Sequence, residues 1–145
     1  MKMVLLKTLF MLLTLTLICI WPRAHADECG PVRAVESVIA GLPVPEGSQL
    51  DESTYYRDDN GVEMVSYRHP ELSGEELLAF FDGCMPLWGW EESGTGDRHR
   101  LQRAYSKDGV PVLIGADKRE EGCSFNILKG VAGDWGYMAP LRTKS

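Results

Sequence analysis

Apolar and polar residues alternate with a period of two along much of the second half of the chain. From Val110 to Ala116, apolar side chains take every second position, and from Cys123 to Leu128 the same period places Cys123, Phe125 and Ile127 on one face. Side chains of a strand point to alternate faces, so this pattern predicts strands with one buried side. The Val110 to Ala116 segment also carries Leu113 on its second face, and we expect it to be the central strand.

Four other segments have the composition of strands. Two of them flank Asp58-Asp59-Asn60-Gly61, where Asn-Gly tolerates the positive φ of a tight turn, and they predict a β-hairpin. Turn residues separate the later strands from one another. The four segments are Ser53 to Arg57, Val62 to His69, Trp90 to Glu92 and Arg100 to Ser106.

A helical period of apolar residues follows Pro70. Ser73 is placed to cap this helix, and Glu76 three residues later completes a capping box, so the helix should begin at Gly74. Pro86 lacks a backbone donor, which predicts that the regular helix ends near Cys84. The stripe expected to face the core consists of Leu77, Phe80, Phe81, Cys84 and Trp88.

A second, shorter helix is predicted near the start of the domain. Between Pro31 and Ala40, Val32, Val35, Val38 and Ile39 recur at helical spacing, and Gly41 and Pro43 follow as stop signals. The two prolines of residues 42–48 favour an extended connector over a paired strand.

Together these elements predict an α+β fold. An antiparallel sheet of the order β-β-α-β-β-β should carry one main helix packed on one face, plus the short N-terminal helix. We assign residues 27–130 to this single domain and residues 131–145 to a C-terminal tail.

The first 26 residues have the pattern of a cleavable signal peptide. Lys2 and Lys7 precede an apolar run of about 14 residues, and Ala24-His25-Ala26 follows it. This run is shorter than the roughly 20 residues that a membrane-spanning helix needs. We therefore expect cleavage after Ala26 and a periplasmic or secreted product without a stable membrane anchor.

Removal of the leader makes the chain more acidic. The full sequence has 15 basic and 21 acidic residues, and the leader takes Lys2, Lys7 and Arg23, which leaves 12 against 21, or about −9. A field of that sign disfavours nucleic acid as a partner. One basic cluster could still form an anion or acidic-partner surface or a solvated strand edge. It comprises Arg98, His99, Arg100 and Arg103, and the aromatic residues of the tail that could join a binding surface or the core are Trp135 and Tyr137.

The mature chain has three cysteines, Cys29, Cys84 and Cys123. An exported protein meets an oxidising compartment, so one disulfide and one remaining thiol are expected. If short connections alternate between the ends of the sheet, Cys84 and Cys123 lie at opposite ends. This argument favours Cys29 with Cys84, with Cys29 to Cys123 as the alternative. The wide spacing does not fit a zinc site.

Catalytic motifs are missing from the sequence. The mature chain offers only His69 and His99 as imidazoles, and neither accompanies a nucleophile motif, a metal-binding helix motif or a phosphate loop. We expect both histidines to have surface or hydrogen-bonding roles, and we expect no catalytic residue, metal or cofactor.

Three motifs carry a resemblance to a known group of proteins. They are residues 42–47 (LPVPEG), residues 73–81 (SGEELLAFF) and residues 85–90 (MPLWGW). The pattern resembles small uncharacterised bacterial envelope proteins of α+β fold, over roughly residues 42–129. The resemblance implies a periplasmic domain and supplies no catalytic residue.

The sequence thus predicts an exported, non-catalytic protein that binds a protein or cell-wall component. One alternative is an inhibitor or immunity-type protein directed at an envelope-targeted enzyme, for which an acidic surface would suit a basic target. A small hydrolase is the other alternative. The ligand and the oligomeric state stay open.

Overall fold

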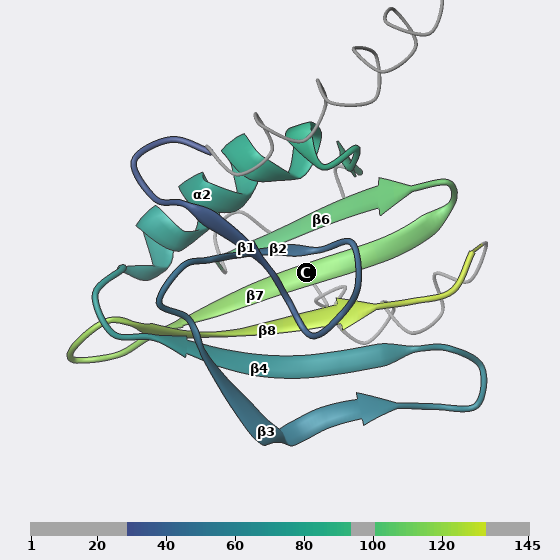
Figure 1. The fold of residues 1–145 in the computed structure, drawn as a ribbon, viewed down its shortest axis with the longest axis horizontal. Helices are drawn as coiled ribbons and strands as arrows, with labels where there is room; N and C mark the ends of the chain where they lie inside the picture. The colour runs from purple at the N-terminus through teal and green to yellow at the C-terminus, as the bar shows by residue number, and fades with distance from the viewer. Residues whose placement is uncertain (1–28, 94–100, 133–145) are drawn as a thin grey trace, which may run out of the picture.

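The computed structural model describes residues 29–93 and 101–132. Within them, six strands form one antiparallel sheet in the order β3-β4-β8-β7-β6-β5, and two short strands, β1 and β2, form a separate ribbon (Figure 1). The elements are β1 (Ala34–Glu36), β2 (Pro43–Pro45), β3 (Gln49–Arg57), β4 (Glu63–His69), α2 (Gly74–Leu87), β5 (Glu91–Glu92), β6 (Gln102–Lys107), β7 (Val110–Lys118) and β8 (Cys123–Lys129).

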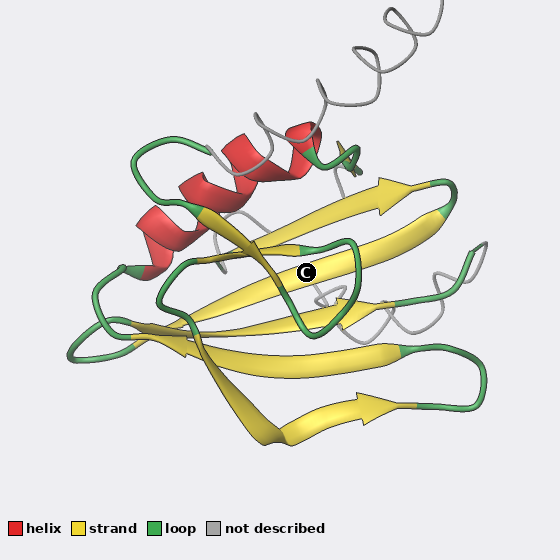
Figure 2. Ribbon diagram, viewed as in Figure 1, coloured by secondary structure: helices red, strands yellow, loops and turns green. Residues whose placement is uncertain are grey.

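The predicted fold class is confirmed, whereas the predicted strand order is not. The described residues form a mixed α+β structure with antiparallel sheets and a single helix (Figure 2). Four strands, rather than three, follow the helix in the main sheet. The last of them, β8, inserts between β4 and β7, so the two halves of the sheet are joined only when the end of the domain is in place.

The predicted hairpin and central strand are also confirmed. Strands β3 and β4 pair across a turn in which the Asp58 carboxylate accepts hydrogen bonds from the backbone N–H groups of Asn60 (2.9 Å) and Val62 (2.8 Å). Gly61 has φ +91°, which L side chains rarely adopt. Strand β7 lies inside the sheet between β8 and β6.

The prediction of a short N-terminal helix is wrong. Ala34–Glu36 pairs with Pro43–Pro45 as an antiparallel ribbon, so the segment predicted to be an unpaired connector is extended but paired. The Ser37 hydroxyl accepts a hydrogen bond from Ile39 N and donates one to Ile39 O, which stabilises a turn instead of a helix. Val38, one of the four residues at helical spacing, is 44% exposed. A ribbon of two strands tolerates proline because its outer edge needs no partner.

Helix α2 begins as predicted. The Ser73 side chain accepts from the backbone N–H of Glu76 (3.2 Å), and the Glu76 carboxylate accepts from the backbone N–H of Ser73 (2.8 Å). The predicted end near Cys84 is wrong, because the helix continues to Leu87 with Pro86 in its last turn. Pro86 has no backbone N–H group to donate to the carbonyl of Asp82, one turn earlier. Proline is tolerated there because Pro86 and Asp82 are both exposed.

The core lies between α2 and one face of the sheet, which we call the inner face. Leu77, Phe80, Phe81 and Cys84 of the predicted stripe are buried, while Trp88 is only partly buried. The Phe81 ring meets the Phe125 ring of β8 edge-on at 5.9 Å between centroids. From the sheet, the core receives Val65, Val112, Ile114, Phe125 and Ile127.

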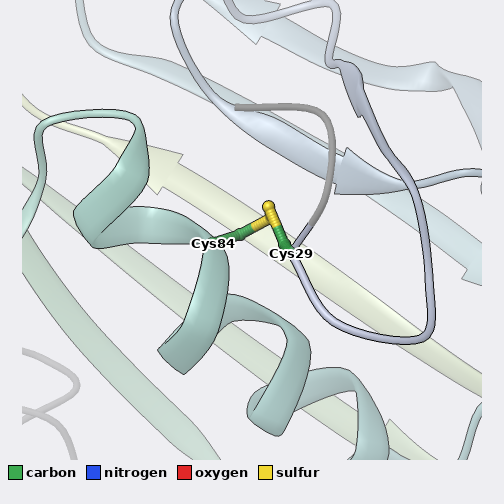
Figure 3. Close-up of a disulfide and its surroundings, with 2 residues drawn as sticks. All are labelled: Cys29 and Cys84. Atoms are coloured by element: carbon green, nitrogen blue, oxygen red, sulfur yellow. A yellow bond between two sulfur atoms is a disulfide. The ribbon is translucent and has the colours of Figure 1, made fainter. Parts of the chain in front are cut away.

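The preferred disulfide is confirmed, and the alternative with Cys123 is wrong. Cys29 and Cys84 are bonded with their Cα atoms 4.8 Å apart, which ties the start of the described chain to the second half of α2 (Figure 3). Cys123 is a buried free thiol opposite His69, close to the beginning of α2. Burial raises the pKa of this thiol, which keeps it in the protonated form.

Strand β3 is bent at the edge of the sheet. Its pairing with β4 shifts register between Asp51 and Tyr56, and the hydroxyl of Thr54 replaces the missing ladder contacts. This hydroxyl donates to Asp51 O (2.7 Å) and accepts from Ser66 N (2.8 Å). The bend is visible along the lower margin of the sheet in Figure 2.

Reduction of the disulfide should destabilise the domain. Cys29 and Cys84 are 55 residues apart, and closing a loop of that length stabilises by about 4 kcal/mol in the chain-entropy model. Urea unfolding followed by circular dichroism, with and without reductant, measures the difference. A Cys29→Ser/Cys84→Ser variant should not respond to reductant, whereas Cys123→Ala should respond as the wild type does. An unchanged urea midpoint on reduction of the wild type would contradict this account.

The capping box should make stability depend on pH in the acidic range. Hydrogen bonds from the backbone of Ser73 and then from its side chain lower the pKa of Glu76 below its ordinary 4.5. A carboxylate whose pKa is lower in the folded state than in the unfolded state stabilises the fold. This stabilisation is present above the unfolded-state pKa and is lost as the pH falls through the folded-state pKa. Glu76→Gln should therefore be less stable than the wild type at neutral pH, and the difference should narrow as pH falls below 4.5. The exposed Glu71→Gln is the matched control, and a difference independent of pH would refute the prediction.

Candidate binding surface on the outer face of the sheet

The two faces of the main sheet have different chemistry. In β4, the buried residues Glu63, Val65, Tyr67 and His69 alternate with Met64, Ser66 and Arg68, which point to the other side. Helix α2 and the β1–β2 ribbon both lie on the inner face (Figure 2). Val44 of the ribbon and Ile39 and Leu42 of its connecting turn join the core. The opposite side, which we call the outer face, is the candidate functional surface.

Strand register arranges the outer face into three rows that run across the strands. Residues that pair directly lie about 5 Å apart and form the members of one row. An apolar row contains Tyr56, Met64, Leu128, Leu113 and Ala104. A polar row contains Asp51, Ser66, Asn126, Gly115 and Gln102, and a charged row contains Gln49, Arg68, Ser124 and Asp117.

The outer face is hollowed over the polar and charged rows. The hollow, which we call the outer-face groove, has a volume of about 830 Å³. The turn between β7 and β8 forms one wall, and the bent part of β3 contributes to the other. The lining residues are Asp51, Thr54, Ser66, Tyr67, Arg68, Asp117, Arg119, Glu120, Glu121, Ser124 and Asn126. Such a volume is in the range of small-molecule and short-peptide sites.

Two side-chain hydrogen bonds hold the floor of the groove. The Ser66 hydroxyl of β4 donates to the Asn126 carboxamide oxygen of β8 at 2.5 Å. The Ser124 hydroxyl accepts from Nε of Arg119 at 3.0 Å. Ser66 uses only the oxygen of the Asn126 side-chain amide, which leaves the two N–H donors of that amide for other partners. Next to Asn126, Gly115 has no side chain, so the sheet backbone itself is accessible at this point.

Charges of both signs line the groove. It has four carboxylates, from Asp51, Asp117, Glu120 and Glu121, and two guanidinium groups, from Arg68 and Arg119. The Arg68 guanidinium forms no hydrogen bond or ion pair with any residue in the part of the chain that the structure describes. A surface of this kind suits a ligand that itself carries both charges.

The predicted basic cluster is not part of this groove as far as the structure describes it. Arg98, His99, Arg100, Trp135 and Tyr137 lie outside the described residues. Arg103 pairs with Ile114 and therefore faces the inner side.

Arg103 has a structural contact on that side. Its Nε donates to the two carboxylate oxygens of Asp82 on α2, at 2.9 and 3.2 Å. The buried Tyr105 hydroxyl donates to the same carboxylate at 2.9 Å, and burial raises the pKa of Tyr105. These contacts fasten α2 to β6, so Arg103 stabilises the fold.

His69 has the hydrogen-bonding role that the sequence suggested. The ring is buried, and its Nδ1 accepts from the backbone N–H groups of Glu71 (3.2 Å) and Leu72 (3.1 Å). Its Nε2 lies 3.1 Å from the carbonyl oxygen of Glu46 and donates to it. All three partners are backbone groups, so the ring joins the end of β4 to two neighbouring segments and presents no free nitrogen to a substrate. His99 lies outside the described residues.

Across residues 29–93 and 101–132, no group of three or more His, Cys, Asp or Glu side chains is placed to hold a metal ion. In those same stretches no helix has both the length and the apolar character needed to cross a bilayer.

Comparison with protein-family models, with curated proteins and with solved structures gave no match.

The sequence interpretation missed the outer-face groove, although a signal was present. The polar residues Ser66 and Arg68 alternate with buried positions of β4, and Ser124 and Asn126 do the same in β8. Each pair marks a strand face that avoids the core. Their convergence depends on β4 pairing with β8, and Ser66 and Asn126 are 60 residues apart in the sequence.

Removal of the Asp82 carboxylate should cost more stability than removal of the Arg103 guanidinium. Asp82→Ala leaves the buried Tyr105 hydroxyl without its partner, which costs about 2 kcal/mol. Arg103→Ala breaks a partly exposed ion pair, which is worth about 1 kcal/mol or less, and a hydrogen bond to the partly buried Gln102 backbone oxygen. Urea unfolding of both variants and of Tyr105→Phe measures these effects. Equal losses in the two alanine variants would exclude the assigned role of Tyr105.

Proposed function

We propose that this protein is an exported, non-catalytic binding module that holds a short peptide of the cell wall in its outer-face groove. The observation that carries the proposal is the groove itself, with its mixed charges and its row of hydroxyl and amide groups. Peptides of the cell wall carry amines, carboxylates and amide bonds over a few residues. Each of these groups finds a complementary group in the groove.

The size of the groove favours a short ligand over a whole protein surface. A stable protein interface buries about 1,600 Å² in total and is commonly centred on aromatic anchors. The groove has a volume of about 830 Å³ and is lined by polar side chains. Tyr67 is the one aromatic residue among its described lining residues, and its ring points to the inner face, where it stacks on Phe125. A partner protein that inserts one extended segment is the competing ligand, and the experiment below separates the two.

Two other features support this proposal. The Cys29–Cys84 disulfide is compatible with an oxidising compartment outside the cytoplasm. The binding role, in place of hydrolysis, is supported by His69, whose ring nitrogens are both used by backbone groups. The inhibitor alternative has no specific support in the described residues.

Cosedimentation with purified peptidoglycan sacculi tests the proposal. The chain from residue 27 onward, with its disulfide formed, should bind sacculi, and Asn126→Ala should weaken binding about tenfold through the loss of a hydrogen-bonding group, equivalent to 1.4 kcal/mol. Asn60→Ala, in the exposed hairpin turn away from the groove, is the matched control and should bind as the wild type does. Both variants should keep the wild-type circular dichroism spectrum.

Two results would count against the proposal. Wild-type affinity in Asn126→Ala would place the ligand elsewhere on the molecule. Absence of sacculus binding, together with stoichiometric capture of one envelope protein that Asn126→Ala fails to capture, would replace the cell wall with a protein partner.

A further inference from the structure

Two arginines stand next to Ser124 at the charged row of the groove. Ser124 of β8 is the direct cross-strand neighbour of Arg68 in β4. From the other side, Nε of Arg119 donates to the Ser124 hydroxyl at 3.0 Å. All three residues line the outer-face groove. Two arginine side chains therefore belong to the neighbours of the same serine at one end of the groove.

This arrangement is unusual in an acidic protein. The chain has a net charge of −6, and carboxylates line the same groove, so each arginine has acidic residues within its surroundings. Even so, among the described residues the only hydrogen bond or ion pair of either guanidinium is the bond from Arg119 to Ser124. A bound anion is attracted by both of these cationic groups.

Arg68, Arg119 and Ser124 all offer unused hydrogen-bond donors. Arg68 has its whole guanidinium fork, and Arg119 has its two Nη groups beyond the bonded Nε. The Ser124 oxygen accepts from Arg119, which leaves its own O–H group to donate. A planar carboxylate accepts bidentate hydrogen bonds from guanidinium groups, with more geometric specificity than a point charge provides.

We propose that Arg68, Arg119 and Ser124 form a cradle for the terminal carboxylate of the bound peptide. The inference takes its ligand, a short peptide, from the proposed function. It adds which end of the peptide is recognised and in which direction the peptide lies in the groove. Asp117, the other cross-strand neighbour of Ser124, repels a carboxylate and accepts from an N–H group. The peptide therefore places its carboxylate on the Arg68 side of Ser124 and its preceding amide towards Asp117.

A pair of small peptides tests the cradle without knowledge of the natural ligand. The probes are N-acetyl-D-alanyl-D-alanine with a free carboxylate and the same peptide with a terminal amide. Binding is followed by NMR titration, using the arginine Nε–Hε signals and the backbone signal of Ser124. We expect the wild type to bind the carboxylate form at least tenfold more tightly than the amide form, because the amide lacks the charge and one acceptor.

Variants assign this preference to the cradle. Arg68→Gln and Arg119→Gln should each reduce the preference for the carboxylate form, with little change in affinity for the amide form. Arg57→Gln is the matched control, since Arg57 is also exposed but lies at the far end of β3, and it should keep the full preference. Equal binding of the two forms by the wild type, or a preference that survives in both variants, would overturn the cradle.

A second comparison of peptides identifies the source of the ligand and separates failure of the cradle from failure of the proposed function. The L,L form of the acetylated dipeptide stands for the C-terminus of a protein. Tighter binding of the D,D form supports the cell wall, whereas tighter binding of the L,L form keeps the cradle and overturns the cell-wall source. If neither form binds at millimolar concentration while sacculi still bind through Asn126, the cradle is wrong and the proposed function stands.

Discussion

The packing of α2 against the centre of the sheet governs the rest of the structure. Phe81 contacts Phe125 near the middle of β8, and the other large side chains of the helix gather around this contact on the inner face. Burial of one face at roughly 25 cal/mol per Å² of apolar surface is the main favourable term for a domain of this size. Because the helix and the β1–β2 ribbon both occupy the inner face, polar residues can collect on the outer one.

Local sequence signals predicted the local elements of this fold. The capping box at Ser73, the hairpin turn at Asn60-Gly61 and the alternation in β7 each depend on residues within about one turn or one strand, so they can be recognised in a single sequence. The β1–β2 ribbon was missed because three valines and an isoleucine matched a helical spacing by chance. Their actual burial is decided by the turn around Ser37 and by contacts with distant parts of the chain.

The candidate site could be predicted even less well. Its polar residues stand on strands whose neighbours in space are far apart in sequence, and strand order is the least local property of a sheet. Alternation showed that Ser66 and Asn126 avoid the core, but only the insertion of β8 beside β4 brings them together. The disulfide was predictable because it does not depend on strand order. The lengths of the connections alone place Cys123 and Cys84 at opposite ends of the sheet, which leaves Cys29 as the partner of Cys84.

The bend in β3 has a consequence for how the molecule behaves at high concentration. A long, straight outer strand offers a row of unpaired backbone groups to which another chain can add, and this is a common start of aggregation. In β3 the irregular stretch between Asp51 and Tyr56 interrupts that row, and at the other margin β5 has only two residues. Both margins of the sheet therefore discourage fibrils, and the protein can accumulate without its copies joining strand to strand.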